Sequence, residues 1–167
     1  MSNYWENSLF PQFLSSIDSC TLSDFTTYQI QSELDGLAIR AIQDFMFPQY
    51  SLEYDIVPYD KDVSATINPL TGIGYGYFFV NDNVGQKEYN VILARMKQYW
   101  VEFQISQERL FANAYYDKEI RLHSPGNTID KLLKMFTTFE KLADKAEYKY
   151  NRTTLTGNSG IGEINDD

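Results

Sequence analysis

The 167-residue chain contains a single cysteine, Cys20, and a single histidine, His123. One cysteine rules out an internal disulfide, and an unpaired thiol is typical of a reducing compartment. One His and one Cys, far apart in the chain, cannot supply the three or four such ligands of a usual zinc site. Asp55, Asp60 and Asp62 lack the spacing of a calcium-binding loop. We therefore expect no metal site and no cofactor.

The chain also lacks long apolar runs. No stretch approaches the roughly 18 consecutive apolar residues that a membrane-spanning helix needs. The first residues do not show the basic segment and apolar core of a signal peptide. We expect no association with a membrane.

Recognisable catalytic motifs are missing as well. His123 precedes the turn at 124–127, and no nucleophile motif surrounds it. The Gly-rich segment 72–76 precedes a predicted strand and lacks the Walker lysine, so a hairpin loop is favoured over a phosphate-binding loop. Cys20 is best interpreted as an idle thiol. We predict a protein that is not an enzyme, with a small hydrolase as a minor alternative.

The acidic excess of the chain, a formal net charge of -9, disfavours nucleic-acid binding, which needs clustered Lys and Arg. Much of the excess lies near the N-terminus. Residues 1–50 hold six acidic residues and one arginine, which gives 1 − 6 = -5. Solubility is the simplest explanation of such a charge.

Hydrophobic spacing and turn residues predict a mainly helical α+β fold. We expect a helical bundle of three main helices, a small antiparallel β-hairpin and an extended C-terminal tail. Residues 1–152 would form a single domain, with an N-terminal arm and short helix in 1–20, and residues 153–167 would form the tail. The predicted elements are helices at 11–18, 21–45, 85–112 and from 127 to about 150, strands at 50–57 and 75–80, and short strands at 64–67 and 119–123.

The last predicted helix has the clearest apolar stripe of the chain, from Ile129 to Tyr150 in steps of three or four. From this pattern we expect Phe136→Asp to prevent folding. The helix at 85–112 is apolar on more than one face, because Val101 and Ile105 lie off the stripe that contains Met96. That helix is therefore either central to the fold or packed on a neighbouring subunit.

Aromatic residues make up 16% of the chain, and Tyr is favoured at interfaces because its ring is apolar and its hydroxyl polar. A chain of this length cannot easily bury all of them. We expect contacts with partners at the second face of the helix around Met96–Phe103, at the loop and strand 72–78 and in the tail. The candidate interface residues are Tyr75, Tyr77, Phe78, Trp100, Leu155, Ile161 and Ile164.

Several short motifs follow one another between residues 34 and 150. They are the step Phe47–Pro48 at the end of a helix, the acidic, aromatic strand Leu52–Asp55, a long helix with Met96 and Trp100, and the turn Ser124–Asn127 leading into Lys131–Leu133. The order of these motifs resembles the small neck proteins of tailed bacteriophages, which are head–tail connector, adaptor or head-completion proteins. The Gly-rich insertion 68–76 and the C-terminal tail fall outside this pattern.

The resemblance implies a structural virion protein that forms a homo-oligomeric ring, typically a dodecamer, at the head–tail interface. The ring would be assembled in the host cytoplasm, would contact the portal protein and other neck or tail-completion proteins, and would line a channel that DNA crosses without tight binding. An acidic channel wall would repel phosphate. The alternative is an acidic inhibitor, a DNA mimic that binds a nucleic-acid enzyme.

Overall fold

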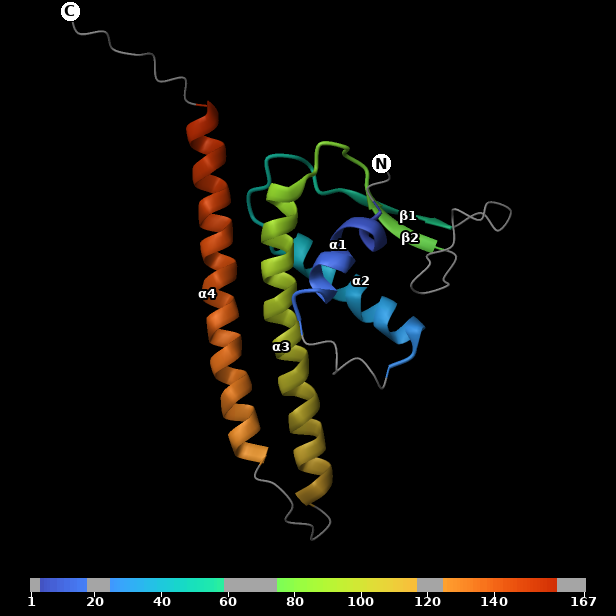
Figure 1. Ribbon diagram of the computed structural model, residues 1–167, viewed down its shortest axis with the longest axis vertical. Coiled ribbons are helices and arrows are strands. Elements are labelled where there is room, and N and C mark those ends of the chain that lie inside the picture. The colour runs from blue at the N-terminus through green and yellow to red at the C-terminus, as the bar shows by residue number, and fades with distance from the viewer. Residues whose placement is uncertain (1–3, 18–24, 59–74, 117–124, 159–167) are drawn as a thin grey trace, which may run out of the picture.

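The computed structural model describes residues 4–17, 25–58, 75–116 and 125–158. These residues form a mainly helical fold with one small antiparallel sheet, as predicted (Figure 1). In chain order the elements are α1 (Trp5–Leu14), α2 (Thr27–Gln43), β1 (Tyr54–Pro58), β2 (Tyr75–Phe79), α3 (Gln86–Tyr116) and α4 (Pro125–Asn158).

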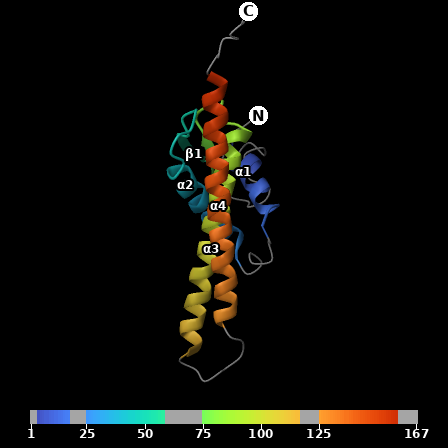
Figure 2. The same cartoon turned by 90° about the vertical axis from the view of Figure 1, so that its left-hand side faces the viewer.

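Helix α3 is the centre of the molecule. It runs antiparallel to α4, and it contacts α1 and α2 as well (Figure 1). Figure 2 shows the same arrangement from the side of α4, with α1, α2 and the sheet lying behind the helical pair. These smaller elements surround only one half of α3, so the other half of the α3–α4 hairpin projects beyond them. Val101 and Ile105 are buried within the single chain, which favours the central position over a contact with a neighbouring subunit.

The N-terminal helix differs from the prediction in position and importance. It spans residues 5–14 and not 11–18, and Pro11 lies inside it. An interior proline costs a helix about 3 kcal/mol, because one hydrogen bond is lost and the ring crowds the preceding turn. Burial of Trp5, Leu9 and Phe13 offsets that cost. The predicted number of main helices, three, is therefore wrong: α1 is a fourth helix with a full share of the core.

Helix α2 begins at a capping box. Thr26 accepts a hydrogen bond from the backbone N–H of Gln29, and the Gln29 side chain accepts one from the N–H of Thr26. The helix therefore starts after Thr26 and not at 21, where the sequence predicted it. It ends at Gln43, two residues before the predicted end and well before Pro48.

The predicted β-hairpin is present. β1 and β2 pair antiparallel with Tyr54 opposite Phe79 and Asp55 opposite Phe78. β1 is shorter than the predicted strand 50–57. An isolated bridge between Tyr4 and Phe78 attaches the chain just before α1 to the free side of β2.

Helix α4 continues through the predicted start of the tail. It ends at Asn158, so the predicted boundary at 152/153 falls inside the helix. The hydroxyl groups of Thr153 and Thr154 donate to backbone carbonyls one turn earlier, and no helix-breaking residue occurs before Gly157. The possible strands at 64–67 and 119–123 and the tail beyond 158 lie outside the described residues.

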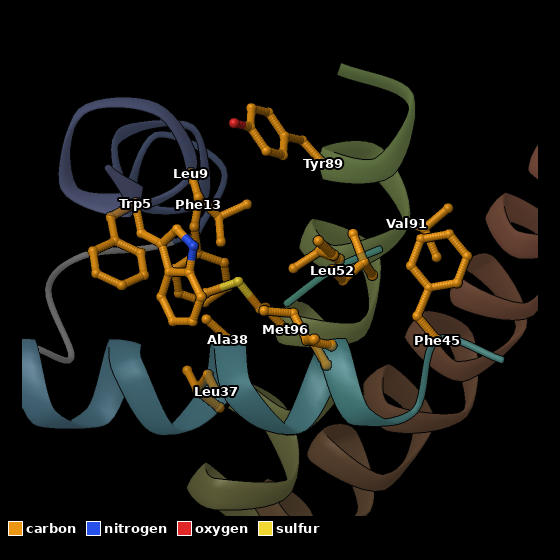
Figure 3. Packing of buried hydrophobic residues seen from close by; sticks show 14 of the residues in the cluster. Trp5, Leu9, Phe13, Leu37, Ala38, Phe45, Leu52, Tyr89, Val91 and Met96 are labelled. Atoms are coloured by element: carbon orange, nitrogen blue, oxygen red, sulfur yellow. The ribbon is translucent and has the colours of Figure 1, made fainter. Parts of the chain in front are cut away.

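The hydrophobic core lies where α1, α2 and the sheet meet α3 (Figure 3). Trp5, Phe13 and Leu9 of α1 point toward Leu37 of α2 and Met96 of α3. Aromatic rings fill much of this space. Among the residues that the structure describes, nine aromatic side chains are buried: Trp5, Phe10, Phe13, Phe45, Phe79, Tyr89, Tyr99, Trp100 and Tyr150.

Candidate functional site

The predicted interface residues fall in different environments. Trp100 is only 5% exposed and packs between Phe13 and Phe103, so it belongs to the core of the single chain and does not face a partner. Tyr75 opens β2 and Leu155 lies in the last turns of α4. Ile161 and Ile164, like His123 and Cys20, lie outside the described residues. Tyr77 and Phe78 are consecutive residues of β2, so their side chains lie on opposite faces of the strand.

Tyr77 lies on the inner face of the sheet and is half-buried. Its ring stacks on Trp5 with 5.0 Å between ring centroids, and it meets Tyr54 edge-on at 5.8 Å. Trp5 also contacts Phe79. This aromatic cluster joins α1 to both strands, so Tyr77 stabilises the fold in the single chain.

Phe78 lies on the outer face, where strand alternation brings it together with Val80 and with two acidic residues of the neighbouring strand. Asp55 is opposite Phe78, and the backbone N–H of Val80 donates to the carbonyl of Glu53. Glu53, Asp55 and Val80 are exposed, and Phe78 is partly covered by the ring of Tyr4. We call Glu53, Asp55, Phe78 and Val80 the sheet patch.

The most chemically unusual group is a buried cluster of Glu6, Gln31 and Asp35 between α1 and α2. All three residues are buried. The Gln31 side-chain amide donates to Glu6 Oε1 at 3.2 Å and to Asp35 Oδ1 at 3.1 Å. Burial, and then the neighbouring Glu6 carboxylate, raise the pKa of Asp35 to about 7. Burial also raises the pKa of Glu6. The cluster therefore holds a proton between α1 and α2 near neutral pH.

Two buried oxygens of this cluster, Glu6 Oε2 and Gln31 Oε1, have no hydrogen-bond partner among the described residues. Such atoms cost free energy unless a proton or another donor reaches them. A carboxyl pair of this kind can exchange a proton. Two open pockets in the described part of the chain, one along α4 at 130–138 and one between α2 and α3, lie elsewhere, so neither brings a substrate to the pair.

A second polar cluster fastens α4 to α3. Arg95 of α3 donates to Glu147 at 2.8 Å and to Asp144 at 2.9 Å. The other oxygen of Glu147 accepts the backbone N–H of Met46 at 3.0 Å. Glu147 thus connects α4 both to α3 and to the segment that follows α2.

Tyr150 makes the equivalent connection one turn further along α4. Its hydroxyl donates to Glu88 at 2.7 Å and accepts the backbone N–H of Gln49 at 2.7 Å. Burial and the bond to Glu88 raise the pKa of Tyr150 to about 12, so the phenol keeps its proton. The ring meets Phe45 edge-on at 5.0 Å. These contacts fix the C-terminal half of α4 on the core.

An open groove of about 340 Å³ separates α2 from α3. The guanidinium of Arg40 lies 3.9 Å from the centre of the Tyr99 ring and pairs with Glu102 at 2.6 Å. The Tyr99 hydroxyl donates to Asp44. Arg40, Tyr99 and Glu102 in this groove therefore interact with neighbouring side chains of the same chain.

The outer surface of α4 combines apolar and basic side chains in one line. Six exposed residues repeat in steps of four and three, which places them along one stripe of the helix. Met135 and Leu142, at its centre, are 44% and 50% exposed. We call these residues the α4 stripe: Lys131, Met135, Thr138, Leu142, Lys145 and Lys149.

None of the lysines of the α4 stripe forms an ion pair with the residues that the structure describes. α4 holds six basic and four acidic residues, a net +2, whereas the rest of the chain holds eight basic and nineteen acidic residues, a net -11. The stripe is thus a basic, partly apolar surface on an acidic protein. Sequence reasoning missed it because it followed only the apolar stripe from Ile129 to Tyr150.

The buried carboxyl cluster was also missed by sequence reasoning, although a signal was present. Glu6 lies on the apolar side of α1, three residues before Leu9, and Gln31 and Asp35 share the line of α2 that contains Ala38. Polar residues at core positions are unusual unless they pair with one another. The spacing identifies such residues but does not show that two helices bring them together.

Within the described residues, no group of three or more His, Cys, Asp and Glu side chains could hold a metal ion. The helices described here include none that is both long and apolar enough to cross a membrane. Comparison of the chain with protein-family models, curated proteins and solved structures gave no match.

Proposed function

We propose that this chain is a structural assembly protein, a subunit of an oligomeric ring in the neck of a tailed bacteriophage. In this role it would join the portal and head to the tail and line the channel through which DNA passes. The order of motifs between residues 34 and 150 suggests the phage neck. The proposal of assembly rests on the surface of the structure.

The observation that carries the proposal is the α4 stripe. Met135 and Leu142 are about half exposed on a long helix, side by side with lysines that no described residue neutralises. Apolar side chains placed in a line at helical spacing form a surface that a protein partner can cover. Phe78 and Val80 give the sheet a second surface of the same kind.

The described polar clusters favour a structural role over catalysis. The buried hydrogen bonds and the ion pair described above connect different elements: Gln31 and Glu6 connect α2 to α1, and Glu147 and Tyr150 connect α4 to α3. A subunit that transmits forces between head and tail benefits from helices fastened in this way. A DNA mimic would need acidic side chains spread at phosphate-like spacing. The lysines on the surface of α4 therefore favour an assembly protein over a DNA mimic.

The test is the oligomeric state of the purified chain, alone and with a portal protein. Light scattering coupled to gel filtration and negative-stain microscopy should reveal rings that form alone or on the portal. A chain that stays monomeric at every concentration and binds neither portal nor tail proteins would contradict the proposal.

Two matched variants test whether the α4 stripe forms part of the assembly interface. Met135→Ser combined with Leu142→Ser should weaken ring formation while leaving the helical circular-dichroism signal unchanged. Leu133→Ser is the control, because Leu133 is 40% exposed on the same helix but lies outside the stripe. Equal assembly of both variants would remove the α4 stripe from the interface.

A further inference from the structure

We propose that the α4 stripe of one copy docks on the sheet patch of a second copy, in a head-to-tail contact. This inference rests on the proposed assembly function and names the two surfaces that meet. The partner that covers the α4 stripe is thus another copy of the same chain.

The two surfaces complement each other in composition. The α4 stripe has Met135 and Leu142 in the middle and lysines around them, and the sheet patch has Phe78 and Val80 beside two carboxylates. Apolar groups would meet apolar groups while charges of opposite sign pair at the rim. Rim pairs contribute only about 0–1 kcal/mol each, so they set orientation and partner choice, and the apolar contact supplies most of the affinity.

The two surfaces belong to elements on different sides of α3. In Figure 1, α4 lies on one side of α3 and the sheet lies on the other. A contact between two different surfaces leaves one of each free at the ends of a dimer, so further copies can add. Such a contact builds a ring when its rotation closes and an open filament when it does not.

A symmetric contact between two copies of α4 is disfavoured by charge. In an antiparallel pair centred on the stripe, Lys131 of one helix would lie near Lys149 of the other. Like charges at such positions are destabilising. The sheet patch offers the carboxylates of Glu53 and Asp55, which are exposed and carry the sign that the lysines require.

Two charge-reversal variants test the contact. Lys145→Glu with Lys149→Glu reverses the stripe, and Glu53→Lys with Asp55→Lys reverses the sheet patch. Assembly is followed by sedimentation velocity at low and high salt, and folding by thermal circular dichroism. The control for the stripe variant is Lys87→Glu with Lys97→Glu, which makes the same change in charge on α3, outside both surfaces.

Each variant alone should need about tenfold more protein to assemble, a loss of about 1.4 kcal/mol, whereas the control should assemble like the wild type. An equimolar mixture of the two variants should recover assembly, because the reversed stripe of one matches the reversed patch of the other. High salt should weaken assembly of the wild type and of the mixture alike.

The inference is overturned if either reversal variant assembles like the wild type, or if the mixture does not recover. Assembly that is insensitive to these reversals leaves the proposed function standing and removes only this contact. A wild-type chain that never assembles, alone or with a portal protein, overturns the inference together with the proposed function.

Discussion

The two halves of α4 differ in how they are covered. In the docked half, 143–154, Ala143, Glu147 and Tyr150 are buried against α3 and the segment after α2. In the projecting half, 128–142, none of the side chains is buried, although the apolar stripe is just as regular there. The same helical pattern therefore forms a core contact in one half and a partly exposed surface in the other.

This difference shows that periodicity alone does not measure stabilisation. A stripe contributes in proportion to the apolar area that neighbouring elements remove from water. The docked half has α3 and the 45–52 segment as neighbours, whereas among the described residues the projecting half lies beside the C-terminal half of α3 alone. In the proposed assembly, a second copy would cover the projecting half.

The largest expected effect compares two phenylalanines. Phe13→Ala removes a fully buried ring and should lower the free energy of unfolding by about 3–5 kcal/mol. Phe136→Ala removes a half-buried ring from the projecting half and should lower it by about 1 kcal/mol. Urea denaturation followed by circular dichroism measures both. Equal losses in the free energy of unfolding would contradict the difference in packing between the core and the projecting half of α4.

For the same reason, the structure changes the expectation for Phe136→Asp. Phe136 lies outside the main core cluster, so a charge there should loosen the projecting half locally and leave the core folded.

The next effect compares two carboxylates that bind the same Arg95. Their distances to its guanidinium are similar, but the Glu147 side chain is 8% exposed and the Asp144 side chain 63%. Glu147→Ala should cost about 3 kcal/mol, because it leaves Arg95 and the Met46 N–H without their buried partner. Asp144→Ala should cost less than about 1 kcal/mol. Thermal and urea denaturation of both variants check this ranking, and similar losses would contradict it.

The smallest effect depends on pH and concerns Asp35. Its pKa is about 7 in the folded protein, above the ordinary value near 4 of the unfolded chain. The folded state therefore binds this proton more tightly than the unfolded chain does. Ionisation of Asp35 lowers the free energy of unfolding progressively as the pH rises from about 4 to about 7, and this loss reaches its full size above about pH 7.

Asp35→Asn keeps an acceptor for Gln31 and cannot ionise. Above pH 7 it should be more stable than the wild type by about 1–2 kcal/mol, and the gain should vanish toward pH 4. Melting curves across this range measure the difference. Glu33→Gln is the control on the same helix, and a gain that does not change with pH would argue against a protonated Asp35.

The local elements could be predicted from particular residues. The alternation around Tyr54 and the aromatic run at 75–80 predicted the hairpin, and the spacing from Ile129 to Tyr150 predicted α4. Pro11 was misleading as a helix start, since its cost is local and the burial that offsets it comes from α2, α3 and the sheet. Thr153 and Thr154, with their low helix propensity, likewise gave no indication that α4 continues to Asn158.

The sequence by itself determined the mainly helical class, the hairpin and the apolar stripe of α4 from Ile129 to Tyr150, because these follow from spacings of two, three and four residues. Only the tertiary structure decided that α3 is central, that Trp100 is a core residue and that Gln31 of α2 bonds to Glu6 of α1. It also decided that α4 is buried in one half and exposed in the other. These outcomes depend on contacts between segments far apart in the chain, whose geometry no local spacing specifies.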